Sequence, residues 1–230
     1  MAQTVVVEAP DGPAEVLERW QTPRGELALR RVGPHLEIIS NGVFLMDTRN
    51  GESERRLVSE ALERCAAPAP RILIGGLGVG FSLRTAVGAP HVSTIDVVEI
   101  EPAVVAWHAT HLRNITGTAL DDPRVSIREA DLVDVLAAGG DAYDVICLDT
   151  DNGPNWLVFD ANRGLYTADG LDMLRSRLRS GGVLAVWSAS RDEAFERRLA
   201  RGFGAFDTIE IPVPRGSPDI VYLARCVEDA

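Results

Sequence analysis

Acidic side chains stand at the ends of three successive predicted strands. Glu99 closes the second strand of the pattern, Asp131 follows the third, and Asp149 ends the fourth. In an open parallel sheet the carboxyl ends of the strands share one edge, and ligands bind there. Carboxylates gathered at that edge can accept hydrogen bonds from hydroxyl and amino groups, attract a cation and take up a proton. The pattern therefore predicts a site for a polar ligand, and a positively charged ligand would suit it.

A glycine-rich turn precedes these acids in the chain. The apolar strand Ile72–Gly75 runs into Gly76, Gly78 and Gly80, and a helix over about Gly80–Val87 follows. Strand, glycine turn and helix form the layout of a nucleotide site, because glycines let a ligand approach and the helix start presents N–H groups. The spacing is G-x-G-x-G, not the dinucleotide pattern G-x-G-x-x-G. A packing role for the turn is an equally open interpretation.

Some of the acids also have a structural interpretation. Asp131 precedes a predicted helix over Leu132–Ala138 and fits its N-cap, and Glu101 before Pro102 fits another helix start. Glu99 has no such simple role. It follows the glycines by about twenty residues, where a carboxylate can accept two ribose hydroxyls. Together the glycines and the acids favour a ligand site over packing alone.

Strands and helices alternate from Arg71 onward. The predicted strands are Ile72–Gly75, Thr94–Ile100, Val125–Glu129, Val145–Asp149 and Val183–Ser188. The predicted helices are about Gly80–Val87, Pro102–Arg113, Leu132–Ala138, Gly170–Arg179 and Asp192–Gly202. Such alternation predicts parallel strands joined by right-handed crossovers. Two late strands, Asp207–Val213 and Ile220–Cys226, add an antiparallel edge hairpin. The expected fold class is α/β, with a mostly parallel seven-stranded sheet whose last strand is antiparallel.

Residues 1–50 are predicted to form a small β-hairpin or meander region, and residues 51–230 the α/β domain. The meander strands are expected at Glu26–Arg31, His35–Ile39 and Val43–Met46. Asn41-Gly42 is a strong signal for a two-residue hairpin turn between the last two of them. A helix over Glu52–Ala66 is expected to lead into the α/β domain.

The composition argues against several classes of protein. The chain carries 34 acidic and 23 basic residues, a net charge of −11, without the clustered positive charge that nucleic-acid backbones require. All 23 basic residues are arginines, so no lysine is present for Schiff-base chemistry or a Walker motif. No apolar run approaches the roughly 18 residues of a membrane span, and no signal-peptide pattern occurs. We expect a cytoplasmic protein without nucleic-acid or membrane partners.

A metal site is not predicted. Cys65, Cys147 and Cys226 are far apart in the chain, without metal-type spacing. His108 and His111 lie three residues apart on one predicted helix and lack obvious partner ligands. We interpret Cys147 as a buried thiol and both histidines as core or surface residues.

These motifs together resemble the S-adenosylmethionine-binding methyltransferase fold and, more narrowly, spermidine synthase and the related polyamine aminopropyltransferases. The similar stretches are ILIGGLGVG, VVEIEP, DPRVSIREAD, YDVICLDTDNGP with Tyr166, and GGVLAVWS. The segment SNGVFLMD resembles the N-terminal domain of that family. The resemblance implies a Rossmann-like class I methyltransferase fold for residues 51–230 and a homodimer.

The resemblance also implies roles for individual residues. Glu99 would accept hydrogen bonds from the ribose hydroxyls. Asp131 would accept a hydrogen bond from the adenine amino group, beside the Leu132 backbone. Asp149 would be the catalytic residue that orients, and can deprotonate, the attacking amine. The implied cofactor-binding residues are Gly76, Gly78, Gly80, Glu99, Ile100, Asp131, Leu132, Asp149 and Thr150. The implied substrate-binding residues are Asp151, Trp156 and Tyr166, and the loop from Asn152 to Tyr166 is the expected lid.

The sequence departs from the family at positions that hold amines. The glycine turn of the aminopropyltransferases reads GGGDG, and Val79 stands where the Asp would grip the amine of decarboxylated S-adenosylmethionine. Leu45 stands in place of a Gln, and the Tyr-His pair of the linking helix falls near Val58-Ser59. Ammonium groups need polar partners, so the changes favour methyl transfer from S-adenosylmethionine to a small acceptor such as an amine. The alternatives are aminopropyl transfer from decarboxylated S-adenosylmethionine to a polyamine, and a binding protein without catalysis.

Overall fold

The computed structural model describes residues 12–157, 159–214 and 216–226 of the chain. The chain divides into two compact units, residues 1–50 and residues 51–230. Residues 1–11 of the expected meander region and Arg215 of the expected hairpin turn lie outside the described residues. Within the described ranges, no helix combines the length and apolar character needed to cross a membrane.

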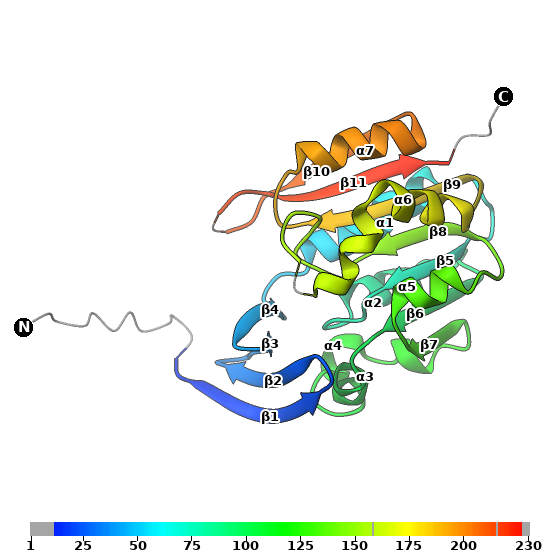
Figure 1. The fold of residues 1–230 in the computed structure, drawn as a ribbon. Coiled ribbons are helices and arrows are strands. Elements are labelled where there is room, and N and C mark those ends of the chain that lie inside the picture. Colours follow the sequence, from blue (N-terminus) through cyan, green and yellow to red (C-terminus); the bar gives the residue numbers. More distant parts are fainter. Residues whose placement is uncertain (1–11, 158, 215, 227–230) are drawn as a thin grey trace, which may run out of the picture. The chain divides into compact units, whose positions relative to one another are not determined.

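The first unit contains a four-stranded antiparallel sheet whose strands follow one another in chain order (Figure 1). Its strands are β1 (Ala14–Thr22), β2 (Gly25–Val32), β3 (His35–Ser40) and β4 (Val43–Asp47). The predicted turn between β3 and β4 is confirmed, because Asn41 and Gly42 have φ angles of 51° and 79°, the positive values that a two-residue hairpin prefers. The sequence pattern does not predict β1, because charged residues interrupt its apolar positions.

The second unit is built on a seven-stranded sheet with the order β10-β11-β9-β8-β5-β6-β7. Its strands are β5 (Arg71–Gly75), β6 (Thr94–Glu99), β7 (Val125–Glu129), β8 (Tyr143–Leu148), β9 (Leu178–Ser188), β10 (Phe206–Ile211) and β11 (Asp219–Arg225). The strands from β9 to β7 pair in parallel, and β11 pairs antiparallel with β9 and β10. The predicted fold class, with its antiparallel last strand, is confirmed.

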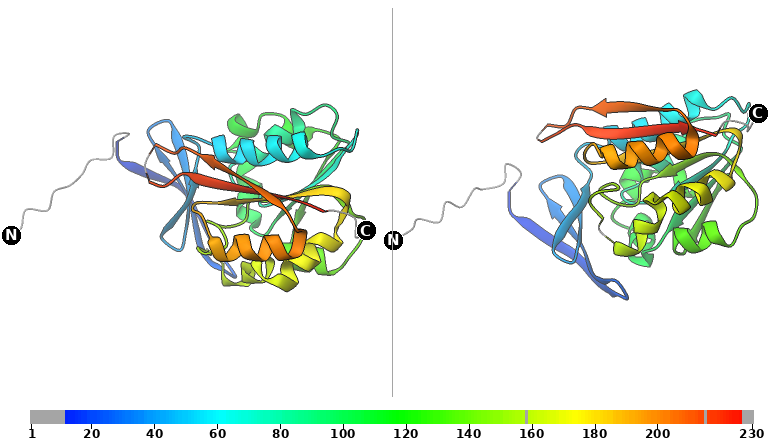
Figure 2. Two further views of the ribbon diagram at one scale, coloured as in Figure 1. Left: turned by 90° about the horizontal axis from the view of Figure 1, so that it is seen from above. Right: turned by 45° about the horizontal axis from the view of Figure 1, so that its top comes forward.

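Helices cover both faces of this sheet. The helices are α1 (Glu52–Arg64), α2 (Phe81–Val87), α3 (Pro102–Ala109), α4 (Arg113–Thr116), α5 (Leu132–Ala137), α6 (Ala168–Ser176) and α7 (Glu193–Phe203), with 3-10 turns η1 (Ala119–Asp121) and η2 (Asp160–Tyr166). Figure 2 shows α1, in cyan, on one face and α6 and α7, in yellow and orange, on the other. Helix α1 packs against α2, and α6 packs against α5 and α7. The strands that lead to Glu99, Asp131 and Asp149 therefore belong to a sheet with helices on both faces.

Two predicted helices end earlier than the sequence pattern suggests. The helix expected to reach Arg113 stops at Ala109, and a separate short helix, α4, follows. The helix expected at Gly170–Arg179 begins at Ala168, where the Thr167 hydroxyl caps it by accepting the Gly170 N–H at 3.1 Å. It ends at Ser176, because Leu178 already pairs with Tyr143 in the sheet. Sheet pairing overrides helix propensity at this boundary.

An aromatic cluster holds α7 against the sheet. The Phe195 ring lies 5.9 Å from the ring of Tyr166 and 5.3 Å from that of Tyr222, both in edge-to-face geometry. Phe195 has no exposed surface, and Tyr166 and Tyr222 are buried as well. Edge-to-face pairs add to the stabilisation that burial of the rings already provides. The same cluster anchors Tyr166 beside the carboxyl edge.

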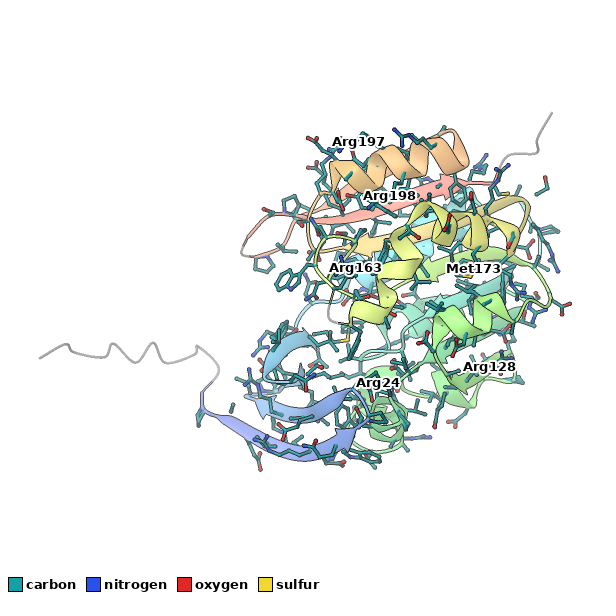
Figure 3. The ribbon with its side chains drawn as sticks, in the orientation of Figure 1. Arg24, Arg128, Arg163, Met173, Arg197 and Arg198 are labelled. Carbon is teal, nitrogen blue, oxygen red and sulfur yellow. The ribbon has the colours of Figure 1, made fainter. Side chains whose placement is uncertain are left out.

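We expect Phe195→Ala to lower the free energy of unfolding by about 3–5 kcal/mol, because it removes a buried ring and leaves a cavity. Arg197→Ala on the same helix is the matched control. Arg197 is 63% exposed and lies on α7 in Figure 3, so its substitution should change stability by less than about 0.5 kcal/mol. Urea unfolding followed by circular dichroism measures both. Equal losses for the two variants would contradict this account of the core.

Candidate functional site

The glycine turn and the three predicted acids lie at the carboxyl ends of four adjacent strands. The sheet order places β8, β5, β6 and β7 side by side. Asp149 follows β8, the glycine turn follows β5, Glu99 ends β6, and Asp131 comes soon after β7. Because these strands are parallel, the turn and the acids share one edge of the sheet. This is the edge at which open α/β sheets bind ligands.

The glycine turn is packed too closely for side chains at two positions. Gly76 has a φ of 93°, and a Cβ there would lie 2.1 Å from the Asp149 carbonyl oxygen. Gly80 has a φ of 94°, and a Cβ there would lie 2.2 Å from Cγ2 of Thr116. Both glycines are therefore required by packing and by backbone conformation. Their role in holding a cofactor stays a prediction, as does that of Gly78, whose φ is 51°.

Glu99 fixes the shape of the glycine turn. Its Oε2 accepts the Leu77 N–H at 2.8 Å, and its Oε1 accepts the Glu101 N–H at 2.8 Å. The side chain is buried, and burial raises the pKa of Glu99 although the backbone donors oppose that shift. Each carboxylate oxygen has two lone pairs, so the side chain retains capacity for another donor. Ile100, the next predicted cofactor residue, is half-buried.

Asp131 is the N-cap of α5, which confirms the structural interpretation of this residue. Its Oδ1 accepts the Val133 N–H at 2.8 Å. The Leu132 side chain is buried in the core, and a Cβ on Gly75 would lie 2.5 Å from its Cδ2. The Leu132 side chain therefore packs against Gly75, the last residue of β5 before the glycine turn. Adenine binding by this pair stays a prediction.

Asp149 lies within hydrogen-bond distance of a helix hydroxyl. The Ser82 Oγ, in the first turn of α2, donates to the Asp149 Oδ2 at 2.8 Å. Burial and then the nearby charge of Glu54 raise the pKa of Asp149 to about 7, against the opposing Ser82 hydrogen bond. A carboxyl group with such a pKa exchanges protons near neutral pH, which suits a general base.

Two further acids, neither of them predicted from the sequence, lie close to Asp149. The Ser53 hydroxyl lies 2.8 Å from Oδ2 of Asp219 and 3.1 Å from Oε2 of Glu54. Burial raises the pKa of both carboxyl groups, and the charge of Asp219 adds to the rise at Glu54. In the described part of the chain, no arginine forms an ion pair with Glu54, Asp149 or Asp219, and the charge of Arg55 lowers the pKa of Glu54 without offsetting the rise. We call Glu54, Asp149 and Asp219 the acid cluster.

One sequence signal for Glu54 does exist. It lies three and four positions before Leu57 and Val58, on the face of α1 that is buried against the sheet. Glu54 is half-buried, and a carboxylate on the sheet-facing side of a helix is unusual because charged groups are mostly exposed. Asp219 carries no comparable signal, since it is simply the first residue of the last strand.

The predicted substrate residues occupy two different settings. Thr150 Oγ1 lies 3.1 Å from the Tyr166 hydroxyl, and Asp151 accepts the Phe159 N–H at 3.2 Å. These contacts tie the start of the expected lid to the strand edge. Trp156 is 56% exposed, so its indole ring faces solvent. Substrate binding by Asp151, Trp156 and Tyr166 stays a prediction.

His108 is a core residue, as one of the two sequence interpretations had it. Its Nε2 lies 2.9 Å from the Gly78 carbonyl and its Nδ1 lies 3.3 Å from Thr116 Oγ1. Burial lowers the pKa of His108, so the neutral ring supports the glycine turn. Among the described residues, no three His, Cys, Asp or Glu side chains group as metal ligands.

The sheet order, with the glycine turn after β5 and the acids on neighbouring strands, defines a Rossmann-like α/β fold. The family model for the spermine/spermidine synthase domain matches residues 39–196, and the chain belongs to this family. Polyamine aminopropyltransferase 2 of Pseudomonas aeruginosa is 32% identical over 189 residues, covering 75% of this chain and 52% of that protein. Polyamine aminopropyltransferase of Corynebacterium efficiens is 30% identical over 179 residues, covering 76% of this chain and 33% of that protein. The chain thus spans about half or less of the length of these relatives.

Solved structures share the fold. A crystal structure of spermidine synthase from Thermotoga maritima superimposes with a TM-score of 0.74 at 17% identity, covering 93% of this chain and 74% of that one. A spermidine synthase in complex with the transition-state analogue AdoDATO gives a TM-score of 0.76 at the same identity and coverage. The family resemblance stated from the motifs is confirmed. The names of the relatives favour aminopropyl transfer, the alternative in the sequence analysis, over methyl transfer.

We expect Asp149→Asn to stabilise the protein at pH 8. The pKa of Asp149 in the folded protein is raised to about 7, so the protonated carboxyl group favours the folded state over the unfolded one. This contribution to the free energy of unfolding is complete below the pKa of an unfolded Asp and is lost as the pH rises through about 7. The amide cannot ionise, so the free energy of unfolding at pH 8 should rise by about 1–4 kcal/mol, at about 1.4 kcal/mol per pKa unit.

Urea unfolding at pH 4 and pH 8 checks this expectation, and the gain should be smaller at pH 4. The exposed Asp172 on α6 provides the control, and Asp172→Asn should change stability by less than about 0.5 kcal/mol at either pH. A less stable Asp149→Asn protein at pH 8 would show that the carboxylate is not strained by its surroundings.

Proposed function

We propose that the chain transfers an aminopropyl group from decarboxylated S-adenosylmethionine to a small polyamine-type amine. The acid cluster carries this proposal. Three carboxyl groups with raised pKa values, two serine hydroxyls and no arginine ion pair among the described residues make a region that favours a cation. An ammonium group is such a cation, and it would form charge-assisted hydrogen bonds with carboxylates. Membership of the spermine/spermidine synthase domain family supports the same substrate class.

The same charges support a decarboxylated donor over intact S-adenosylmethionine. The intact molecule carries a carboxylate, which Glu54, Asp149 and Asp219 would repel at short range. Its decarboxylated form carries a sulfonium and an ammonium and no negative charge. Val79 has no exposed surface, so the position of the family's aspartate belongs to the packed core. The acid cluster therefore supplies negative charge that the glycine turn does not.

The residues of the edge have distinct tasks in this proposal. Glu99 and Asp131 hold the ribose and adenine of the donor, and Glu54 and Asp219 hold the acceptor through its ammonium groups. A sulfonium donor supplies an activated carbon and a neutral thioether leaving group, so alignment is the main requirement. The acceptor nitrogen forms the new N–C bond while the C–S bond breaks, and the proton lost by the nitrogen passes to Asp149. As in the resemblance above, we propose a homodimer as the working form, which light scattering tests.

Incubation with decarboxylated S-adenosylmethionine and short linear diamines should release methylthioadenosine. Asp149→Asn should lower kcat by about 100-fold or more, the usual contribution of a general base. Glu54→Gln should raise KM for the diamine by about tenfold, the effect of one charged hydrogen bond. Glu52→Gln, an exposed acid on the same helix, is the matched control and should leave both constants unchanged.

Other outcomes separate the competing functions. Release of S-adenosylhomocysteine from intact S-adenosylmethionine, with methylated amine as product, would support methyl transfer instead. Calorimetry adds an independent test. Tight binding of a donor to a protein with no activity that Asp149→Asn abolishes would support a binding protein without catalysis.

The pH profile provides a separate test of the acid cluster. Asp149 acts as a base only when ionised, so kcat/KM should rise with pH through about 7 and level off above it. Glu54→Gln removes a like charge that raises this pKa, so the rising limb should move to lower pH. If the rising part of the pH profile does not move in Glu54→Gln, the coupling between the carboxyl groups of Glu54 and Asp149 is contradicted.

A further inference from the structure

Ser82 occupies a buried position between two elements of the proposed site. It lies in the first turn of α2, two residues after Gly80, and only 2% of it is exposed. Its hydroxyl is 2.8 Å from Asp149 Oδ2 and 3.4 Å from the Glu54 carbonyl oxygen. A serine hydroxyl has one proton to donate, and the shorter contact goes to the carboxylate. The hydroxyl therefore restrains one oxygen of the Asp149 side chain.

The backbone of Asp149 is held by the same glycine turn. Its N–H donates to the Gly75 carbonyl at 2.8 Å. Its carbonyl oxygen lies so close to Gly76 that a Cβ there would approach it to 2.1 Å. The backbone of Asp149 is thus held by the end of β5 and the glycine turn. Its side chain is held by Ser82 in the helix that follows the turn.

The acids that act most strongly on Asp149 in the described part of the chain all oppose its ionisation. Glu54 on α1, Glu99 on β6 and Asp219 on β11 each raise its pKa through like charge, after the effect of burial. Two neutral titratable groups also lie nearby. Burial and then the charge of Asp149 raise the pKa of Cys147 on β8, and burial, Asp151 and Asp149 raise that of Tyr166 in η2. The Ser82 hydroxyl acts in the opposite direction, because it donates to the charged form.

We propose that Ser82 is the positioning residue of Asp149, orienting its carboxyl group and setting the pH range in which that group is ionised. The consequence for catalysis rests on the aminopropyl transfer proposed above. Because Ser82 belongs to the helix that begins at the glycine turn, the segment that would hold the donor also aligns the base. A change in the turn would then alter proton transfer as well as donor binding.

The direct test is a ¹³C NMR titration of the Asp149 carboxyl group, assigned by the signal lost in Asp149→Asn. In Ser82→Ala the midpoint should rise by about one pH unit, because a donor to the charged form is gone. Ser82→Thr keeps a hydroxyl and should restore the wild-type midpoint. If the alanine variant fails to fold, Ser82→Cys takes its place. The thiol is nearly the same size as the hydroxyl but a weaker donor, so the midpoint should rise by less. An unchanged midpoint in folded Ser82→Ala overturns the proposal.

The matched control is Ser53→Ala. Ser53 is also a buried serine in the first turn of its helix, but its hydroxyl contacts Glu54 and Asp219 and not Asp149. It should leave the Asp149 midpoint at its wild-type value or below, and a rise equal to that of Ser82→Ala would overturn the proposal.

The pH dependence of activity extends the test to catalysis. Ser82→Ala should lower kcat/KM about fivefold at pH 7, because a one-unit rise from a pKa of about 7 lowers the ionised fraction of Asp149 from about one half to about one tenth. The loss should be much smaller at pH 9, where Asp149 is ionised in both proteins. A purely structural defect would lower it equally at both pH values and would overturn the proposal. The titration needs no turnover. If the wild type transferred no aminopropyl group and the midpoint still rose in Ser82→Ala, aminopropyl transfer would fail while the positioning role stood.

Discussion

The close contact between the glycine turn and the end of β8 is the constraint on which the site depends. The Asp149 N–H donates to the Gly75 carbonyl at 2.8 Å, and a Cβ on Gly76 would come within 2.1 Å of the Asp149 carbonyl. Only glycine permits this approach at a φ of 93°. The distance between the turn and the carboxyl group is therefore set by two backbone segments, which move less than side chains do.

Because of this contact, packing and ligand binding are compatible roles for the same glycines. Two side chains hold the turn: Glu99 accepts the Leu77 N–H, and Nε2 of His108 lies 2.9 Å from the Gly78 carbonyl oxygen. A turn that is already braced in this way loses little conformational freedom when a ligand binds. The two interpretations of the glycines that the sequence leaves open are thus not true alternatives.

The sequence predicts the parts of the site that follow from strand order, and little else. Glu99, Asp131 and Asp149 follow consecutive parallel strands, so their shared edge is a consequence of the fold class. Glu54 and Asp219 join them from α1 and β11. Ser53 and Asp219, which hydrogen-bond to each other, are 166 residues apart in the chain, and no local pattern reveals such a pairing. The same limit applies to the helix that ends at Ser176, because a distant strand recruits Leu178.

The departures from the family are best understood through charge. Val79 removes an acid from the glycine turn, but it lies in the core with no exposed surface. Glu54 on α1 and Asp219 on β11 add acids near Asp149, and their charges help to raise its pKa. Glu54, Asp149 and Asp219 are each half-buried. Removing acids from water without an ion-pair partner costs folding free energy, and a structural role alone would not favour retaining three of them. A positively charged ligand would offset that cost while it is bound. The same electrostatic term thus opposes folding of the free protein and would favour the binding of a cation.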